Sequence, residues 1–230
     1  MTSLMFGEIV EPSTRALIDE DIDEYPAPIE ILPVWEGSCE VPHEIDCLYI
    51  IESADVKDLV NSCVIEKENS LCKLKNGGVE IFSIQEKQYV VVFQEEKELN
   101  VGEITEILDK WIHQAKSIYA ITSESIYNYQ NSLLFERPPF LIRILSNTDN
   151  YIKYDKLEQP NLITGLGSAV LSYCIHHIMK KCTLFVIYID KSQQLSFNST
   201  PILDVFKNTK LPVRNYVVKD KLSNTGNLYM

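Results

Sequence analysis

Residues 89–122 read YVVVFQEEKELNVGEITEILDKWIHQAKSIYAIT, and this stretch decides the fold class. Residues 90–93 form a continuous apolar run, which is typical of a strand buried on both faces. Residues 101–116 carry apolar side chains at helical intervals, which predicts an amphipathic helix. Residues 117–122 then read as a second strand. A strand, a helix and a strand in succession predict a parallel β–α–β unit.

The same alternation extends in both directions along the chain. Further strands are expected at Ile45–Ile51, Leu71–Lys75, Val79–Ile84, Phe140–Leu145 and Cys182–Ile189, and further helices at Asp55–Val64, Gly167–Lys180 and Ile202–Asn208. We therefore expect an α/β fold, a single-domain layered sandwich with a largely parallel central sheet flanked by helices.

The two ends of the chain differ from its centre. Residues 1–36 contain nine acidic residues and one arginine, and prolines recur through the same segment. Such a segment repels itself and buries little surface, so residues 1–40 are expected to form an acidic, Pro-rich arm. Trp35 is interpreted as an anchor of this arm, either to its own domain, which we favour, or to a partner. Residues 41–221 are the expected α/β domain. Residues 222–230 are small and polar, which predicts a flexible tail.

Composition excludes several classes of protein. Of the 230 residues, 45% are hydrophobic, and the net charge is −12. No stretch approaches the roughly 20 apolar residues of a membrane span, and the first residues lack the features of a signal peptide. Five cations in residues 205–230 are a weak version of the basic stripe that nucleic acid requires. We expect a cytoplasmic protein without membrane insertion or nucleic-acid binding.

Residues that carry chemistry are few. The six cysteines show no C-x-x-C spacing, so reduced core thiols are expected rather than a metal site. The adjacent His176 and His177 point about 100° apart on a helix, which fits a surface and a boundary position. Residues 165–168, Gly-Leu-Gly-Ser, begin the expected helix Gly167–Lys180, where backbone N–H groups can hold an anion. The sequence predicts no catalytic residues, no metal and no cofactor.

The last three residues form a recognisable pattern: Leu228, then Tyr229, then Met230 with a terminal carboxylate. A carboxylate suits a pocket with a lysine or backbone donors, and a tyrosine ring gives rigid contact area. The pattern occurs beside two others, Phe6-Gly7-Glu8 near the start and Leu157-Glu158-Gln159-Pro160-Asn161 followed by residues 169–174, AVLSYC. At these three places the chain resembles the proteasome assembly chaperone 1 family.

This resemblance implies a chaperone without enzymatic activity. Members of the family pair with proteasome assembly chaperone 2, and the heterodimer binds the proteasome α-subunits, promotes α-ring formation of the core particle and blocks off-pathway ring dimers. The resemblance assigns docking into an α-subunit pocket to Leu228, Tyr229 and Met230. It also implies a fold like that of nucleoside phosphorylases without their catalytic residues, and extends the localisation to the nucleus or the endoplasmic reticulum.

Three questions stay open at this level. Glu158, Gln159 and Asn161 are interpreted either as residues that fix a loop or as part of a partner interface, while Leu171 and Cys174 are expected in the core. An α/β enzyme of nucleoside-phosphorylase type would use Gly165–Ser168 to bind an anion. An adaptor would instead recruit a basic partner through its acidic arm at Asp19–Glu24.

Overall fold

The computed structural model describes residues 31–65, 70–94, 98–131, 138–148, 153–179, 181–190 and 195–214. The chain divides at Pro33 into two units, and the second unit, from Pro33 onward, carries the fold. The acidic run Asp19–Glu24 and the C-terminal residues Leu228, Tyr229 and Met230 lie outside the described residues.

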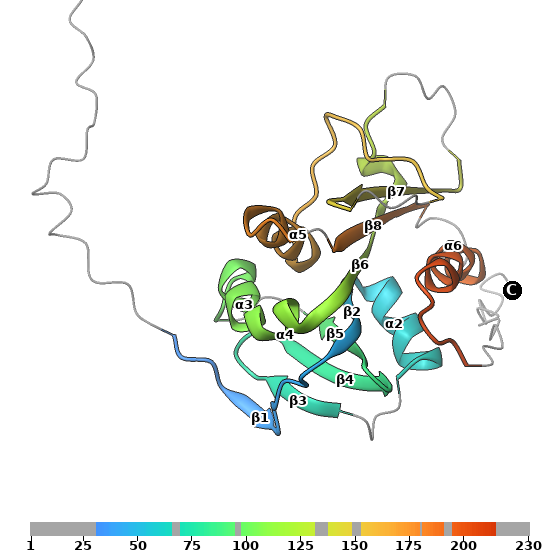
Figure 1. The fold of residues 1–230 in the computed structure, drawn as a ribbon. Helices are drawn as coiled ribbons and strands as arrows, with labels where there is room; N and C mark the ends of the chain where they lie inside the picture. The colour runs from blue at the N-terminus through green and yellow to red at the C-terminus, as the bar shows by residue number, and fades with distance from the viewer. Residues whose placement is uncertain are drawn as a thin grey trace, which may run out of the picture. The chain divides into compact units, whose positions relative to one another are not determined.

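An eight-stranded sheet forms the centre of this unit (Figure 1). Its strands are β1 Trp35–Gly37, β2 Ile45–Ile51, β3 Ser70–Leu74, β4 Val79–Gln85, β5 Gln88–Phe93, β6 Ala115–Ser125, β7 Phe140–Ser146 and β8 Cys182–Ile189. Their spatial order is β1-β3-β4-β5-β2-β6-β8-β7. The sheet is thus mixed, and the expected α/β class is confirmed.

Parallel pairing is confined to the middle of the sheet. Strands β5, β2, β6 and β8 run parallel, whereas antiparallel strands flank them on both sides. The antiparallel hairpin β3–β4 turns at Asn76-Gly77-Gly78, as the sequence predicts. Every residue of β8 is buried, which explains its unbroken apolar sequence.

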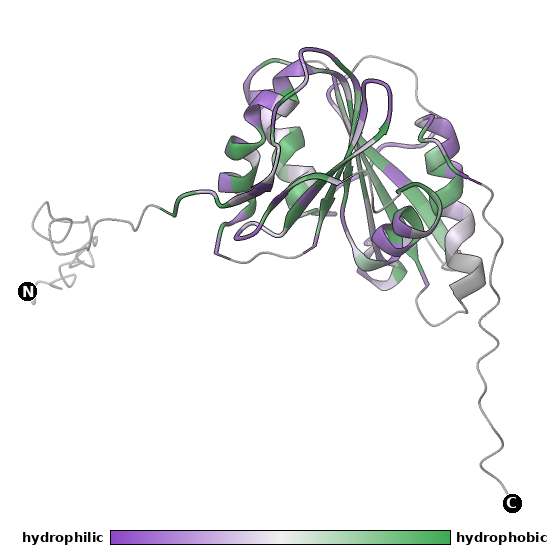
Figure 2. Ribbon diagram, turned by 90° about the horizontal axis from the view of Figure 1, so that it is seen from below, coloured by the Kyte–Doolittle hydropathy of each residue, from purple (hydrophilic) through white to green (hydrophobic). Residues whose placement is uncertain are grey.

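Helices cover both faces of the sheet (Figure 2). They are α2 Ala54–Cys63, α3 Val101–Ile107, α4 Asp109–Gln114, α5 Leu166–His176 and α6 Leu195–Asn208, with a 3-10 turn η2 at Ile126–Asn128. Helices α3, α4 and α5 close one hydrophobic core, and α2 and α6 close the other. No helix in the described part of the chain is long and apolar enough to cross a bilayer.

The expected continuous helix Val101–Lys116 is wrong in two respects. Its start is as predicted, because Asn100 Oδ1 accepts the N–H of Glu103 at 3.0 Å and the Glu103 carboxylate accepts the N–H of Asn100. The helix breaks at Leu108, where the backbone has ψ 0°. It also ends early, because Ala115 pairs with Ile45 of β2, so that strand pairing replaces the last helical turn.

The other two helix boundaries also differ from expectation. Helix α5 stops at His176 rather than Lys180, because Ile178 adopts φ 58° and Met179 N–H returns to Cys174 O at 2.8 Å. Helix α6 begins well before Ile202 and contains Pro201 in its interior. Proline is normally a breaker inside a helix, which is why the sequence favours a later start.

Strand β1 lies within the segment expected to form the arm. Trp35, Glu36 and Gly37 pair antiparallel with β3, and Val34 O accepts the N–H of Lys75 at 2.9 Å. Trp35 is partly buried against the core that α3–α5 cover. The expectation that Trp35 anchors this segment to its own domain is therefore confirmed.

Candidate functional site at the carboxyl edge of the parallel strands

Strands β2 and β6 lie side by side, and their carboxyl ends are at the edge of the sheet where α/β proteins commonly bind ligands. After β2 the chain enters α2 on one face of the sheet, and after β6 it reaches α5 on the other face. A sheet whose adjacent parallel strands continue to opposite faces has a crevice at that point. We therefore take the carboxyl edge between β2 and β6 as the first candidate site.

The side chain of Glu52 fills this crevice. Glu52 follows β2 directly, and its backbone N–H donates to Ile121 O of β6 at 3.1 Å. Its Oε1 accepts the N–H of Leu166 at 2.7 Å, and its Oε2 accepts the N–H of Gly167 at 3.0 Å. These two N–H groups are the ones that would hold an anion at the start of α5.

Two glycines make this contact sterically feasible. Gly165 has φ +104°, and a Cβ there would lie 2.0 Å from Glu52 Oε1. A Cβ on Gly167 would meet Ala120 and Leu184 at 3.0 Å, so this glycine lets α5 approach β6 and β8 closely. The Gly-Leu-Gly-Ser stretch thus allows α5 to pack closely on the sheet, and its N–H groups bind a carboxylate of the same chain.

The ionisation of Glu52 reflects opposing effects. Burial raises the pKa of its carboxyl, and the negative charge of Glu124 raises it further, while the two backbone donors from α5 lower it. Burial is the largest effect, so the pKa lies above the ordinary value. The helix start therefore holds a carboxyl group that is harder to ionise than a free one.

Serine hydroxyls close the rest of this edge. Ser53 Oγ and Ser123 Oγ are 2.9 Å apart, and the N–H of Ser123 donates to Ser53 Oγ at 3.0 Å. Ser123 Oγ also donates to Asp55 Oδ2 at 3.1 Å. A nucleophilic serine requires a base that accepts its proton. Here the hydroxyls bind each other and the start of α2, an arrangement that joins β2 to β6.

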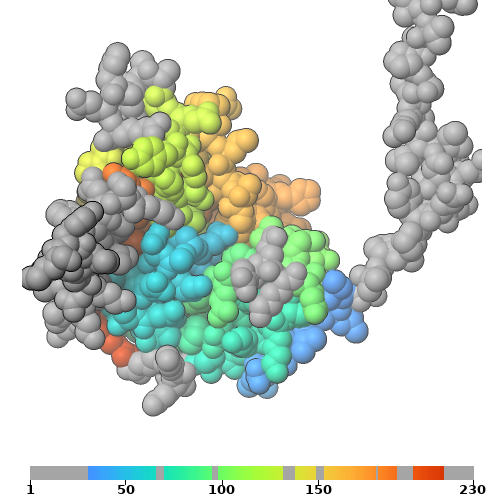
Figure 3. Space-filling model, turned by 180° about the vertical axis from the view of Figure 1, so that it is seen from behind, coloured from blue at the N-terminus to red at the C-terminus, as the bar shows by residue number. Residues whose placement is uncertain are grey.

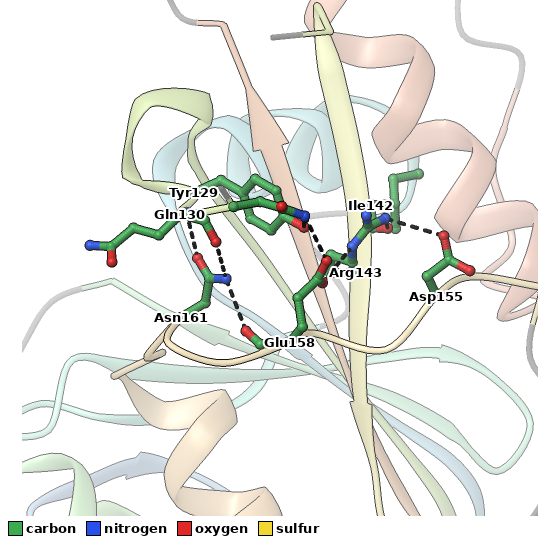
Figure 4. A network of polar contacts seen from close by, with 8 residues as sticks. Tyr129, Gln130, Ile142, Arg143, Asp155, Glu158 and Asn161 are labelled. Atoms are coloured by element: carbon green, nitrogen blue, oxygen red, sulfur yellow. Dashed lines mark hydrogen bonds and ion pairs between the residues drawn. The ribbon is translucent and has the colours of Figure 1, made fainter. Parts of the chain in front are cut away.

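A second polar network holds the loop before α5 (Figure 4). Asn161 Oδ1 accepts the N–H of Gln130 at 2.8 Å, and its Nδ2 donates to Gln130 O at 2.9 Å. The same Nδ2 donates to Glu158 O at 2.9 Å. Asn161 therefore joins its own loop to the segment after η2, and these two segments adjoin on the surface (Figure 3).

Arg143 on β7 lies at the centre of this network. Its Nε donates to Glu158 Oε2 at 3.2 Å, its Nη1 lies 3.4 Å from Asp155 Oδ2, and its guanidinium lies 5.5 Å from the centre of the Tyr129 ring. The Arg143 side chain is only 13% exposed. This partly buried cation connects the loop to β7.

Glu158 responds to that environment. Desolvation raises the pKa of Glu158, but hydrogen bonds, including one with Tyr129, and the charge of Arg143 outweigh it, so the pKa is lowered overall. Asn131 Nδ2 also donates to Glu158 Oε1 at 3.0 Å. An ionised carboxylate with these partners holds the loop in place.

The structure thus brings together Glu158 and Asn161 but not Gln159, which is exposed. Leu171 and Cys174 lie in the core as expected. The role of the three loop residues toward a partner stays a prediction.

His113, which is distant in sequence, lies near His176 and His177 beside α5. His176 and His177 are both exposed, and the His177 ring lies 4.2 Å from the Tyr173 ring. His113 Nδ1 lies 2.7 Å from Asp109 Oδ1, which also accepts a hydrogen bond from Tyr173. Among the described residues, no group of three or more His, Cys, Asp or Glu is arranged to hold a metal ion.

Glu52 is the functional residue that sequence reasoning missed. An acid directly after the buried strand Ile45–Ile51 was the available signal, since such positions lie at the carboxyl edge. Its partners Leu166 and Gly167 are more than 110 residues away. Only the folded chain shows that the two regions meet.

Neither a protein-family model nor a curated protein matches this chain. Among solved structures, it is similar to a protein of unknown function from Thermoplasma acidophilum (12% identity, 76% of this chain and 80% of that one, TM-score 0.51). It is also similar to a protein of unknown function from Corynebacterium glutamicum (9% identity, 77% and 82%, TM-score 0.51). PbaB, an archaeal proteasome activator from Pyrococcus furiosus, aligns at 10% identity over 78% and 89% with a TM-score of 0.44. At these identities, the first two likenesses establish the α/β fold alone.

Proposed function

We propose that this chain is a proteasome assembly chaperone and not an enzyme. It pairs with proteasome assembly chaperone 2 in the cytoplasm, and the heterodimer promotes α-ring formation and blocks off-pathway ring dimers. Leu228, Tyr229 and Met230 dock into a pocket of the proteasome α-subunits. The sequence resemblance at three separated places supports this proposal.

The observation that carries the choice between chaperone and enzyme is the position of Glu52. A nucleoside-phosphorylase type of enzyme would hold its anion on the N–H groups of Leu166 and Gly167. Glu52 binds both of them, at 2.7 and 3.0 Å. A phosphate would have to displace this carboxylate and then lie beside its negative charge, which is unfavourable.

The position of the most specific sequence block is consistent with this proposal. Leu157 packs against the core, Glu158 and Asn161 fix the loop, and Leu171 and Cys174 lie on the buried face of α5. One continuous unit of loop and helix therefore carries this block of the resemblance, and this block concerns how the unit folds. The docking role is independent of it and is assigned to the C-terminal residues.

Co-purification tests the proposal. The tagged full-length chain is compared, in its own cells, with a form lacking residues 228–230, with Tyr229→Ala and with the control Thr225→Ala, which changes the same tail outside the motif. We expect the full chain and the control to recover α-subunits and a second chaperone. The truncation and Tyr229→Ala should recover fewer α-subunits and the same amount of second chaperone.

Two results would overturn parts of this proposal. Equal recovery of α-subunits by all four forms would exclude docking through Leu228–Met230. Failure of the full chain to recover α-subunits would exclude the chaperone role itself.

A further inference from the structure

Two thiols meet at the edge of the sheet. Cys72 Sγ donates a hydrogen bond to Cys39 Sγ across 2.8 Å, although the two residues are 33 positions apart. Both are free cysteines. An S–S bond is about 2.05 Å long, so the two sulfurs need to approach by less than about 1 Å to become bonded.

The pairing of β1 with β3 creates this proximity. Gly37 lies directly opposite Cys72, and Cys39 follows two residues later. Gly37 has φ +93°, and a Cβ there would lie 2.5 Å from Leu71 O. Glycine therefore allows the two strands to come this close while the chain turns toward Cys39.

The two thiols differ in how easily a reagent reaches them. Cys39 is half-buried, whereas Cys72 is only 2% exposed. Burial raises the pKa of the Cys72 thiol, and the neighbouring Cys39 raises it further. An incoming reagent therefore meets Cys39 first, and Cys72 stays protonated behind it.

We propose that Cys39 and Cys72 form a redox clasp, that is, a disulfide that is made by exchange with a small-molecule disulfide such as oxidised glutathione. The Cys39 thiolate attacks one sulfur of oxidised glutathione, and one glutathione thiolate leaves. Cys72 then gives its proton to a thiolate and attacks Cys39 Sγ, which releases the second glutathione. Two protein thiols are oxidised, and one glutathione disulfide is reduced to two thiols.

The clasp acts on a short strand at the edge of the sheet. Strand β1 has three residues, and its neighbours add the hydrogen bond from Val34 N–H to Asn76 Oδ1 at 3.0 Å and the exposed ion pair of Glu36 with Lys75 at 3.5 Å. Short edge strands with few bonds open by local unfolding. With free thiols, β1 stays on β3 through these non-covalent contacts alone, so local opening can expose the β3 edge for pairing with another strand. A bond between Cys39 and Cys72 prevents that opening.

The remaining cysteines provide contrast and a control. Cys174 and Cys182 also lie together, but both have 0% exposure, so a reagent does not reach them in the folded chain. Cys63 Sγ donates to Leu59 O in the buried face of α2. Cys47 is half-buried like Cys39 and has Tyr49 as its neighbour, so Cys47→Ser is the matched control.

The experiment equilibrates the full chain with glutathione buffers from reducing to oxidising, quenches the exchange with acid, and denatures the chain so that the buried thiols are also reached. It then alkylates the free thiols and determines the mass and the disulfide-linked peptides. In oxidising buffer, we expect four alkylated cysteines of the six in the sequence and a linked peptide that contains Cys39 and Cys72. Cys72→Ser should retain one glutathione on Cys39, because the resolving thiol is absent. Cys47→Ser should form the clasp as the wild type does.

A second readout concerns the strand itself. In the oxidised chain, backbone amides of β1 and β3 should exchange hydrogen more slowly, and the melting temperature should rise by about 5 °C or more, reversibly with dithiothreitol. Six alkylated cysteines in the oxidised wild type, or a stable glutathione adduct on its Cys39, would overturn the proposal. If Cys72→Ser fails to fold, the linked peptide in the wild type decides the question alone.

Discussion

The carboxylate of Glu52 lies where a β-carbon on Gly165 would stand, because such a carbon would be 2.0 Å from Glu52 Oε1. The two residues are far apart in sequence, yet each restricts the other. Glycine is required at position 165 both by the backbone, which has φ +104°, and by this carboxylate.

Gly165→Ala should therefore be strongly destabilising. We expect a loss of about 2–4 kcal/mol in the free energy of unfolding, because the substitution adds a steric clash to an unfavourable backbone conformation. Urea denaturation measures this. The control is Gly102→Ala, where the new Cβ meets only Asn100 Oδ1 at 3.1 Å and the change should stay within about 1 kcal/mol. Equal effects of the two substitutions would contradict the role of Glu52.

Glu52 should also give stability a specific dependence on pH. Its pKa is raised in the folded state above the ordinary value of 4.5. The associated stabilisation is then complete below about pH 4.5 and is lost as the pH rises through the folded pKa. The stability of the wild type relative to Glu52→Gln should therefore fall as the pH rises from about 4.5 through the folded pKa. Glu36→Gln, which removes an exposed carboxylate, is the control, and parallel curves for wild type and Glu52→Gln would refute the prediction.

Arg143→Ala should loosen the loop that precedes α5. Its guanidinium binds Glu158 and Asp155, and its removal leaves Glu158 without a partly buried counter-charge. We expect a destabilisation of about 1–3 kcal/mol and faster amide exchange in residues 153–161. Lys153→Ala breaks an exposed pair with Asp204 at 3.4 Å and should cost less than about 1 kcal/mol. Similar exchange in both variants would show that Arg143 does not hold the loop.

Ile178→Gly should stabilise the protein. Ile178 adopts φ 58° at the end of α5 and is 84% exposed. Its backbone is therefore strained, and burial of its side chain contributes little stabilisation to offset that strain. Glycine relieves that strain, which is worth about 1 kcal/mol. Ile175→Gly is the matched comparison, since Ile175 is exposed inside the helix and its replacement should cost about 1 kcal/mol. A change of the same sign in both variants would exclude strain at Ile178.

Sequence reasoning succeeded where the decisive interactions are local. The apolar run Ile45–Ile51 and the fully buried Cys182–Ile189 have the observed strand bounds. The capping box of Asn100 and Glu103 requires only residues three apart. Hydrophobic periodicity and capping involve residues within one or two turns of each other, so both can be recognised in the sequence.

The errors arise where distant residues compete with local preference. Ala115 continues a helical stripe, but its pairing with Ile45 outweighs that preference. Glu52 reads as an ordinary surface acid until α5 is placed against the sheet. The roles of Glu158 and Asn161 were left open because their partners, Arg143 and Gln130, lie on other elements.

Because Glu52 lies at the start of α5, the ligand of the two N–H groups there is a carboxylate of the same chain. Since the carboxylate and the two N–H groups belong to one chain, their association is intramolecular and does not depend on the concentration of a free anion. Leu166 and Gly167 are therefore bound to the same partner whatever the surrounding supply of phosphate. The position of α5 against β2 is therefore fixed from within the chain and needs no bound anion.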